Sequence, residues 1–120
     1  MAVNIEFSRN GTVIAQAVLH DNATARDFAT LLPLLLRMTD YDATEKTADL
    51  PRALTTAGAP DAATPVAGDI CLYVPWGNLA IFYGDGVASP GLVRLGRLTD
   101  GVQALRFPGP MDVTIATTHR

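Results

Sequence analysis

Aromatic and arginine side chains are the residues of this sequence best suited to bind a ligand. They lie in or near predicted strands, and the candidates are Arg52, Tyr73, Trp76, Phe82, Arg94 and Arg97, with Tyr83 in the same aromatic group. The planar donor fork of arginine suits a carbonyl or carboxylate group, and aromatic walls suit a concave site for a small or extended ligand. An arginine on a strand is costly to bury, so it either faces solvent or is held by a partner. The alternative interpretation places the aromatic residues in the core and leaves the arginines solvated.

Metal and nucleophilic chemistry lack the residue patterns that they need. The sequence has two histidines and one cysteine, without C-x-x-C or H-E-x-x-H spacing, and zinc sites are usually built from such clusters. His20, beside Asp21, and the penultimate His119 are interpreted as surface residues. Cys71 lies in an apolar predicted strand, where a thiol is usually part of the core. We predict no metal and no cofactor.

Phosphate-binding and acid–base motifs are missing as well. Residues 84–86 (Gly-Asp-Gly) lack the strand, loop and helix context of a dinucleotide site, and Lys46 is the only lysine, outside any phosphate loop. Asp40 and Asp42 lie two residues apart in a predicted turn. We interpret this carboxylate pair as part of a solvated turn rather than as an acid–base pair.

Composition indicates one soluble globular domain over residues 1–120. Hydrophobic residues make up 48% of the chain and charged residues 18%, which excludes a disordered chain. The net charge of −3 offers no basic surface for a phosphate backbone, so we predict no nucleic-acid partner. The longest apolar run, 31–36, is far shorter than the ~18 residues of a membrane span, and the N-terminal residues do not resemble a signal peptide. These features predict a cytoplasmic protein without membrane association, and a single cysteine is compatible with a reducing compartment.

Short apolar runs between frequent turns indicate a mainly β fold. The chain contains 10 glycines and 8 prolines, and these residues separate short strands. Apolar–polar alternation, one continuous apolar run at 34–38 and the intervening turns predict about eight strands, at 3–7, 13–19, 34–38, 70–74, 79–83, 92–98, 102–107 and 113–117. Asn10-Gly11 predicts a tight hairpin between the first two strands, because both residues tolerate positive φ.

One segment, near residues 24–32, has the spacing of a short helix instead of a strand. Thr24 followed by Asp27 resembles a capping box, and Pro33 ends the helical pattern. Residues 43–69 contain several prolines and glycines and are predicted to be irregular. A connection of this length is either a functional loop or a cover for the core.

Several blocks of the sequence resemble the bacterial cyclophilin-like family, and together they cover nearly the whole chain. They are TARDF at 24–28 with Leu32-Pro33, EKTADLPR at 45–52, GAP at 58–60, GDI at 68–70, PWGNLAIFY at 75–83 and LVRLGRL at 92–98. The resemblance implies a closed eight-stranded β-barrel of the cyclophilin type with one short helix near residues 24–32. A closed barrel has no free strand edge, which would keep so strand-rich a chain soluble.

The resemblance implies less about activity. Full cyclophilins isomerise X–Pro bonds with an arginine beside an apolar proline pocket, and their F-H-R-x-I and F-M-x-Q-G-G-D segments have no counterpart in this sequence. No catalytic residue is therefore carried over from the isomerases. Members of the compact family share a fold, which does not fix a function.

Three function hypotheses follow from these patterns. The first is a binding module that holds a small-molecule or peptide ligand in an outer cleft lined by aromatic and arginine side chains. The second is a weak peptidyl-prolyl cis–trans isomerase. The third is a structural protein that forms oligomers through apolar surface, since few residues are charged; the sequence leaves the oligomeric state open.

Overall fold

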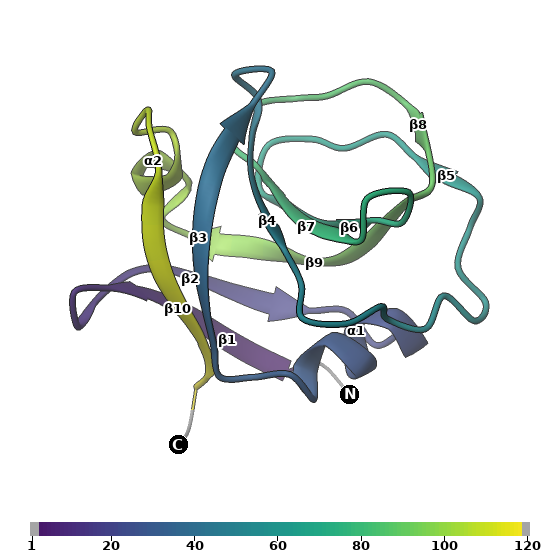
Figure 1. The fold of residues 1–120 in the computed structure, drawn as a ribbon, viewed down its shortest axis with the longest axis horizontal. Coiled ribbons are helices and arrows are strands. Elements are labelled where there is room, and N and C mark those ends of the chain that lie inside the picture. The colour runs from purple at the N-terminus through teal and green to yellow at the C-terminus, as the bar shows by residue number, and fades with distance from the viewer. Residues whose placement is uncertain (1–2, 119–120) are drawn as a thin grey trace.

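The computed structural model describes residues 3–118, which form a closed antiparallel barrel of eight strands (Figure 1). In order around the barrel, the strands are β1 (Val3–Arg9), β10 (Met111–Thr117), β3 (Leu34–Tyr41), β4 (Glu45–Asp49), β7 (Asn78–Phe82), β6 (Asp69–Tyr73), β9 (Leu92–Asp100) and β2 (Thr12–Leu19). This architecture confirms the predicted mainly β barrel with one short helix near residue 24. No helix in residues 3–118 is long and apolar enough to cross a membrane.

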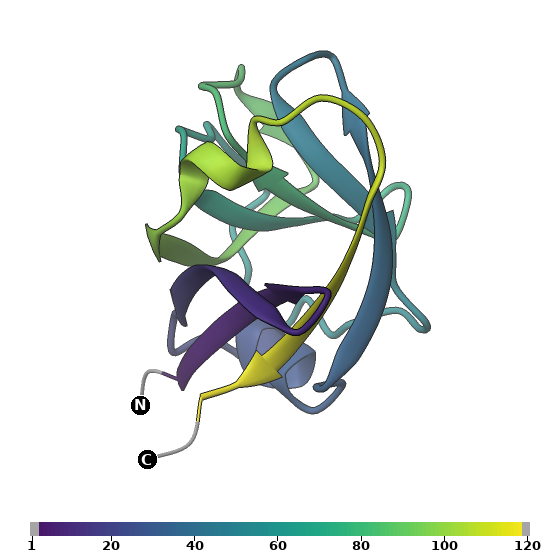
Figure 2. The same cartoon turned by 90° about the vertical axis from the view of Figure 1, so that its left-hand side faces the viewer.

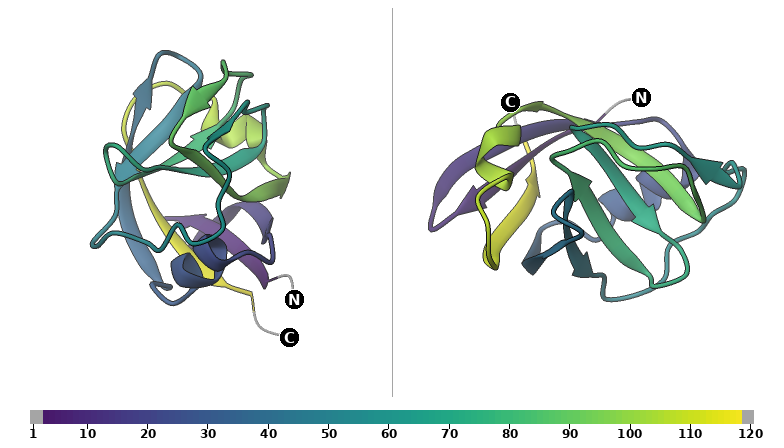
Figure 3. Two further views of the ribbon diagram at one scale, coloured as in Figure 1. Left: turned by 90° about the vertical axis from the view of Figure 1, so that its right-hand side faces the viewer. Right: turned by 90° about the horizontal axis from the view of Figure 1, so that it is seen from above.

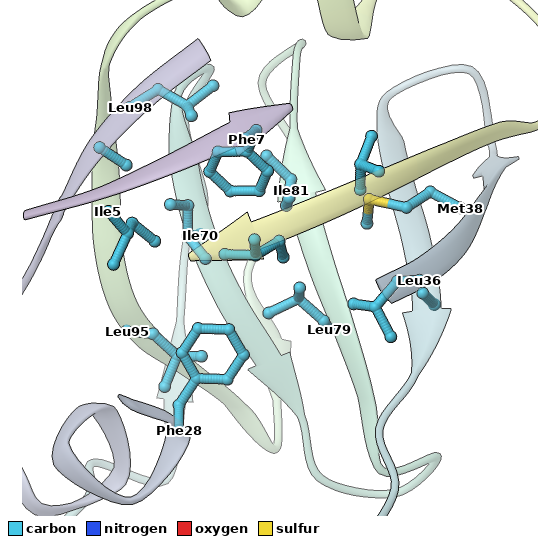
Figure 4. Close-up of a cluster of buried hydrophobic side chains, with 14 of the residues drawn as sticks. Ile5, Phe7, Phe28, Leu36, Met38, Ile70, Leu79, Ile81, Leu95 and Leu98 are labelled. Atoms are coloured by element: carbon cyan, nitrogen blue, oxygen red, sulfur yellow. The ribbon is translucent and has the colours of Figure 1, made fainter. Parts of the chain in front are cut away.

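Alternate side chains of the barrel strands point inward and form the core. Figure 4 shows Phe7, Met38, Ile70 and Ile81 directed toward one another from four different strands. All four are fully buried, and burying a side chain of this size contributes about 1.5–3 kcal/mol to stability. The alternation that predicted the strands therefore corresponds to the inner and outer faces of the barrel wall.

The helix α1 (Ala23–Ala29) covers one end of the barrel (Figure 1). Phe28 is fully buried and points from this helix into the core (Figure 4). The predicted Thr24–Asp27 capping box is wrong, because the N-cap is Asn22, whose Oδ1 accepts a hydrogen bond of 2.8 Å from the N–H of Ala25. An asparagine at the N-cap satisfies one of the free N–H groups of the first turn.

Two of the predicted elements differ in the structure, although the predicted number of barrel strands is right. Residues 102–107 are not a strand: Gly101 adopts a φ of 94°, and α2 (Val102–Leu105) forms one helical turn that buries Leu105. Figure 2 shows this turn on the barrel between β9 and β10. The eighth strand is β4, which lies inside the segment predicted to be irregular and has Ala48 as its only apolar residue.

Two long connections run over the outside of the barrel. Residues 50–68 and 83–91 lie in front of the strands when the molecule is viewed from that side (Figure 3, left), and they pair through β5 (Ala62–Ala63) and β8 (Ser89–Pro90). Between them and the wall is a second apolar cluster, formed by Cys71, Ala80, Phe82 and Leu92 from the outer faces of β6, β7 and β9. Ala63 of the first connection packs against this cluster, so part of residues 50–68 covers packed side chains.

Candidate functional site

A cleft of about 380 Å³ lies on the outer face of the barrel, where the long connections leave part of the wall uncovered. This volume is within the range of pockets that hold small ligands, ~300–1,000 Å³. The floor comes from β4, β7, β6 and β9, and the walls come from the β3–β4 turn, the β6–β7 turn and residues 85–89.

Strand register explains which side chains form the floor. Glu45 of β4 lies opposite Phe82 of β7, and Asn78 of β7 lies opposite Tyr73 of β6. Tyr73 in turn lies opposite Leu92 of β9. Because side chains of paired residues point to the same face of a sheet, these five side chains lie together on the outer surface.

Aromatic rings form one wall of the cleft. Trp76, in the β6–β7 turn, makes edge contacts with Tyr41 and Tyr73, with ring centroids separated by 5.6 and 5.3 Å. Trp76 is 59% exposed although it has these two neighbours. The hairpin turn thus holds a large ring in place at the mouth of the cleft while much of its surface remains available.

All charged side chains that line the cleft are carboxylates: Asp42, Glu45 and Asp85. Burial raises the pKa of Glu45, the nearby charge of Asp42 raises it further, and a hydrogen bond from Thr44 opposes both effects. The Asp85 carboxylate already accepts a hydrogen bond of 2.9 Å from the N–H of Ala67. The site therefore has negative charge with no lysine or arginine among the residues that line it.

Asn78 adds an unused polar group to the floor. The residue is 7% exposed, and its Oδ1 is buried without a hydrogen-bond partner among the described residues. Leaving a buried acceptor unpaired costs about 1–3 kcal/mol. Among residues 3–118 this is the one buried side-chain polar atom without a partner, and buried groups of this kind are rare in native proteins.

The structure brings Tyr73, Trp76 and Phe82 together at the cleft, but it places the candidate arginines elsewhere. Arg94 and Arg97 of β9 both pair with the buried Asp69, at 3.2 and 3.1 Å. Arg94 also donates to the carbonyl of Thr64. These arginines are held by a partner, and they fasten the long connection to the barrel wall. Arg94 also lines a second, smaller hollow of about 170 Å³.

The third candidate arginine, Arg52, fastens the long connection to α1. Its two terminal nitrogens bind the two oxygens of Asp27 at 3.1 and 2.8 Å, and one of them also donates to Thr30 Oγ1 at 2.9 Å. The hydrogen bonds from Arg52 and from the N–H of Thr55 hold the pKa of Asp27 below its usual range. This pairing is bidentate, the geometry in which arginine binds a carboxylate best.

Sequence reasoning missed a charged pair in the barrel wall. Lys46 is fully buried and lies 2.7 Å from Asp40, and its Nζ also donates to the carbonyls of Phe107 and Gly109 at 2.8 and 2.7 Å. Asp40 further accepts hydrogen bonds from the Tyr83 hydroxyl and the Gly109 N–H, both at 2.8 Å. Burial opposes ionisation of Asp40, but these hydrogen bonds lower its pKa overall. The interpretation of Asp40 as exposed to solvent is right, but the residue lies in β3 instead of a turn and is bound by three donors.

The remaining candidates for chemistry have ordinary structural positions. Cys71 is fully buried, and burial raises the pKa of its thiol to about 12. His20 is exposed, as expected, and His119 lies outside the described residues. No group of three or more histidine, cysteine or carboxylate side chains in residues 3–118 is placed to hold a metal ion.

Tyr41, Glu45 and Asn78 are cleft residues that sequence reasoning did not select. Glu45 fell in a segment predicted to be irregular, and the outward direction of Asn78 depends on the strand register. Asn78 belongs to the PWGNLA block. A polar residue at the start of an apolar strand was the one feature of the sequence that could have marked Asn78 as a cleft residue.

Comparison with known proteins supports the fold on independent grounds. The model of the Cyclophilin-like family matches residues 8–116. A solved structure, that of the hypothetical protein AF2241 from Archaeoglobus fulgidus, has a TM-score of 0.70 and 15% sequence identity, over 97% of this chain and 95% of the other. No curated protein matches the sequence. Since the family model spans most of the barrel, from β1 to β10, this chain belongs to the Cyclophilin-like family.

Proposed function

We propose that the protein binds a small-molecule ligand in the cleft between the β3–β4 turn, the β6–β7 turn and residues 85–89. The observation that carries this proposal is the unpaired Oδ1 of Asn78 on the floor of a cleft whose wall holds three contacting aromatic rings. A ligand that hydrogen-bonds to this amide would remove the cost of the unpaired group, and the rings would provide the apolar contact area.

The arginines do not take part in the proposed site. They are absent from its lining, and each is paired with a carboxylate. This arrangement also reduces support for the prolyl isomerase alternative, which calls for an arginine beside an apolar pocket. A coupled isomerisation assay on a proline tetrapeptide tests it, and we expect no acceleration at micromolar protein.

The oligomer-forming alternative depends on exposed apolar side chains. The most exposed of these, Leu35, Val87 and Phe107, come from β3, the β7–β8 connection and the segment after α2. Light scattering tests this alternative directly, since a monomeric mass at high concentration would remove it.

A fragment screen tests the binding proposal. We would use a library with equal numbers of cationic, neutral and anionic aromatic fragments, and record amide and indole chemical shifts of the protein. We expect some fragments to shift the Trp76 indole and the backbone amides of Tyr73 and Asn78. Trp76→Ala should abolish binding of those fragments, whereas Phe107→Ala, which removes an exposed ring outside the cleft, should preserve it. A screen in which no fragment of any charge perturbs the cleft would overturn the proposal.

A further inference from the structure

We infer that the cleft selects a small organic cation, an aromatic or alkyl ammonium that retains at least one N–H. The inference rests on the proposed function, because it specifies the ligand of the same cleft. Three features carry it: the ring of Trp76 with its neighbours, the sign of the charge along the lining, and the amide of Asn78.

The aromatic wall has the geometry that binds cations. Trp76 presents an exposed ring, and Tyr41 and Tyr73 contact it edge-on with interplanar angles of 82° and 86°. Trp76 thus stands at a steep angle to both tyrosine rings, and all three residues line the same cleft. Cations bind to the faces of such rings, with tryptophan the strongest, and desolvation in a cleft strengthens the attraction.

The electrostatics of the lining also favour a cation. Asp42, Glu45 and Asp85 contribute negative charge, and basic residues are absent from the lining. The nearest basic groups along the chain are already paired, Lys46 with Asp40 and Arg94 with Asp69. No ion pair of Glu45 occurs within residues 3–118, where its hydrogen-bond partner is Thr44 at 3.4 Å. A cationic ligand would therefore be the counter-charge of this carboxylate.

The amide of Asn78 is an independent indication of a hydrogen-bond donor. Its Oδ1 is an acceptor without a partner, and an amide oxygen can only accept a hydrogen bond. An N–H of an ammonium group can satisfy this oxygen, whereas a carboxylate ligand has no donor to offer it. The amide thus selects for a cation with an N–H over a fully alkylated one.

Fluorescence of Trp76, the only tryptophan of the chain, reports binding at the cleft. We would titrate the protein at neutral pH with three ligands of one shape: phenethylammonium, 2-phenylethanol and phenylacetate. The ammonium is expected to bind about tenfold more tightly than the alcohol, the difference that one well-placed charge interaction of ~1.4 kcal/mol produces. Phenylacetate is expected to bind more weakly than the alcohol, and the trimethylated phenethylammonium more weakly than its parent.

Matched variants connect the preference to the carboxylates. Glu45→Gln keeps the shape of the side chain and should reduce the preference for the ammonium over the alcohol to about twofold or less. Asp42→Asn is a second test. The local backbone accommodates this substitution, because Asp42 has a φ of 54° and asparagine adopts that conformation readily. Asp112→Asn removes the same charge from an exposed pair on β10, and should leave the preference unchanged.

The outcomes separate this inference from the proposed function. If the three ligands bind equally, or phenylacetate binds best, the cation inference is overturned while a binding cleft remains. If Glu45→Gln and Asp42→Asn both retain the full preference, the inference fails as well. If no ligand of the trio and no fragment of the screen binds at the cleft, the proposed function itself fails.

Discussion

Glu45 and Lys46 are neighbours in the sequence, but they lie on opposite faces of β4. Glu45 faces the outer cleft, and Lys46 is buried on the inner side with Asp40 and the carbonyls of Phe107 and Gly109. Because successive side chains of a strand point in opposite directions, the backbone of β4 keeps the ammonium group away from the cleft. The chain's only lysine therefore stabilises the barrel and does not neutralise the carboxylate in the cleft.

Removal of the Lys46 ammonium should destabilise the barrel strongly. Lys46→Met removes one of the three donors of the Asp40 carboxylate and the donor of two carbonyls, and each buried acceptor left unpaired costs about 1–3 kcal/mol. Urea unfolding followed by circular dichroism measures the loss. The difference from the unchanged protein should shrink as the pH falls below ~3.9, the ordinary pKa of aspartate, because the lowered pKa of Asp40 gives stability that is present above that value and is lost on protonation.

The control for this prediction is an ion pair on the surface. Arg37 and Asp112 lie 3.3 Å apart, with both side chains more than half exposed, and pairs of this kind contribute ~0–1 kcal/mol. Arg37→Met should therefore change the free energy of unfolding very little. Equal losses for the two variants would contradict the role assigned to Lys46.

Gly96 is required by the pairing of β9 with β2. A Cβ atom at this position would lie 2.3 Å from the carbonyl oxygen of Val18 and 2.9 Å from Cα of Leu19, and neither backbone atom can move without disrupting the sheet. Gly96→Ala should lower the free energy of unfolding by about 3 kcal/mol. Gly84→Ala is the matched control, because its nearest neighbour, Cα of Thr44, would lie at an ordinary 3.8 Å. If the Gly96→Ala variant had the same free energy of unfolding as the control, β9 and β2 would be able to move apart at this position without loss of stability.

The fold could be predicted from sequence wherever apolar alternation reports the two faces of the wall. β6 and β7 follow that rule, with Ile70 and Ile81 inside and Cys71 and Ala80 outside. β4 does not follow it, because its inward Lys46 is satisfied by partners more than 60 residues away in the sequence. Residues 102–107 have some apolar alternation, but the chain turns at Gly101 with positive φ and forms a helical turn instead.

The candidate site was only partly predictable, for a different reason. Trp76 and Tyr73 stand out by residue type, and the register brings them together. The arginines stand out equally, yet each binds an aspartate that is 25 or 28 residues away in the sequence. A sequence shows which residues are able to bind a ligand, whereas the fold determines which of them are already paired with another residue.

Binding of phenethylammonium should depend on the ionisation of Glu45. Burial raises the pKa of this carboxyl above ~4.3, its ordinary value, and a cation is attracted only to the ionised form. Affinity should therefore be constant near neutral pH and fall as the pH decreases through the raised pKa. The other carboxylates that line the cleft are Asp42 and Asp85, and nearby Cys71 and Tyr83 stay neutral because their pKa values are about 12.

The variant Glu45→Gln separates the contribution of Glu45 from that of the two aspartates. Its affinity for phenethylammonium should be low at neutral pH and should change less with pH than that of the unchanged protein. Trp76 fluorescence titrations at several pH values measure both profiles. Identical pH profiles for the two proteins would exclude Glu45 as the carboxylate whose ionisation determines the affinity for the cation.

Asn78 should show opposite effects on stability and on binding. Leucine has the same branching as asparagine and no polar atoms, so Asn78→Leu removes the unpaired Oδ1 without removing any hydrogen bond of that atom. We expect the free energy of unfolding to stay unchanged or to rise by up to about 1 kcal/mol, while the affinity for phenethylammonium falls. Thermal unfolding and fluorescence titration of the same sample measure the two quantities.

Asn22 is the matched control, since its amide has partners on both atoms. Its Oδ1 accepts from the N–H of Ala25 at 2.8 Å, and its Nδ2 donates to the carbonyl of Arg94 at 3.2 Å. Asn22→Leu should therefore lower the free energy of unfolding by about 1 kcal/mol through loss of the helix cap, without affecting the cleft. If Asn78→Leu were the less stable of the two variants, the amide of Asn78 would serve the fold, and the reason for assigning it to a ligand would be lost.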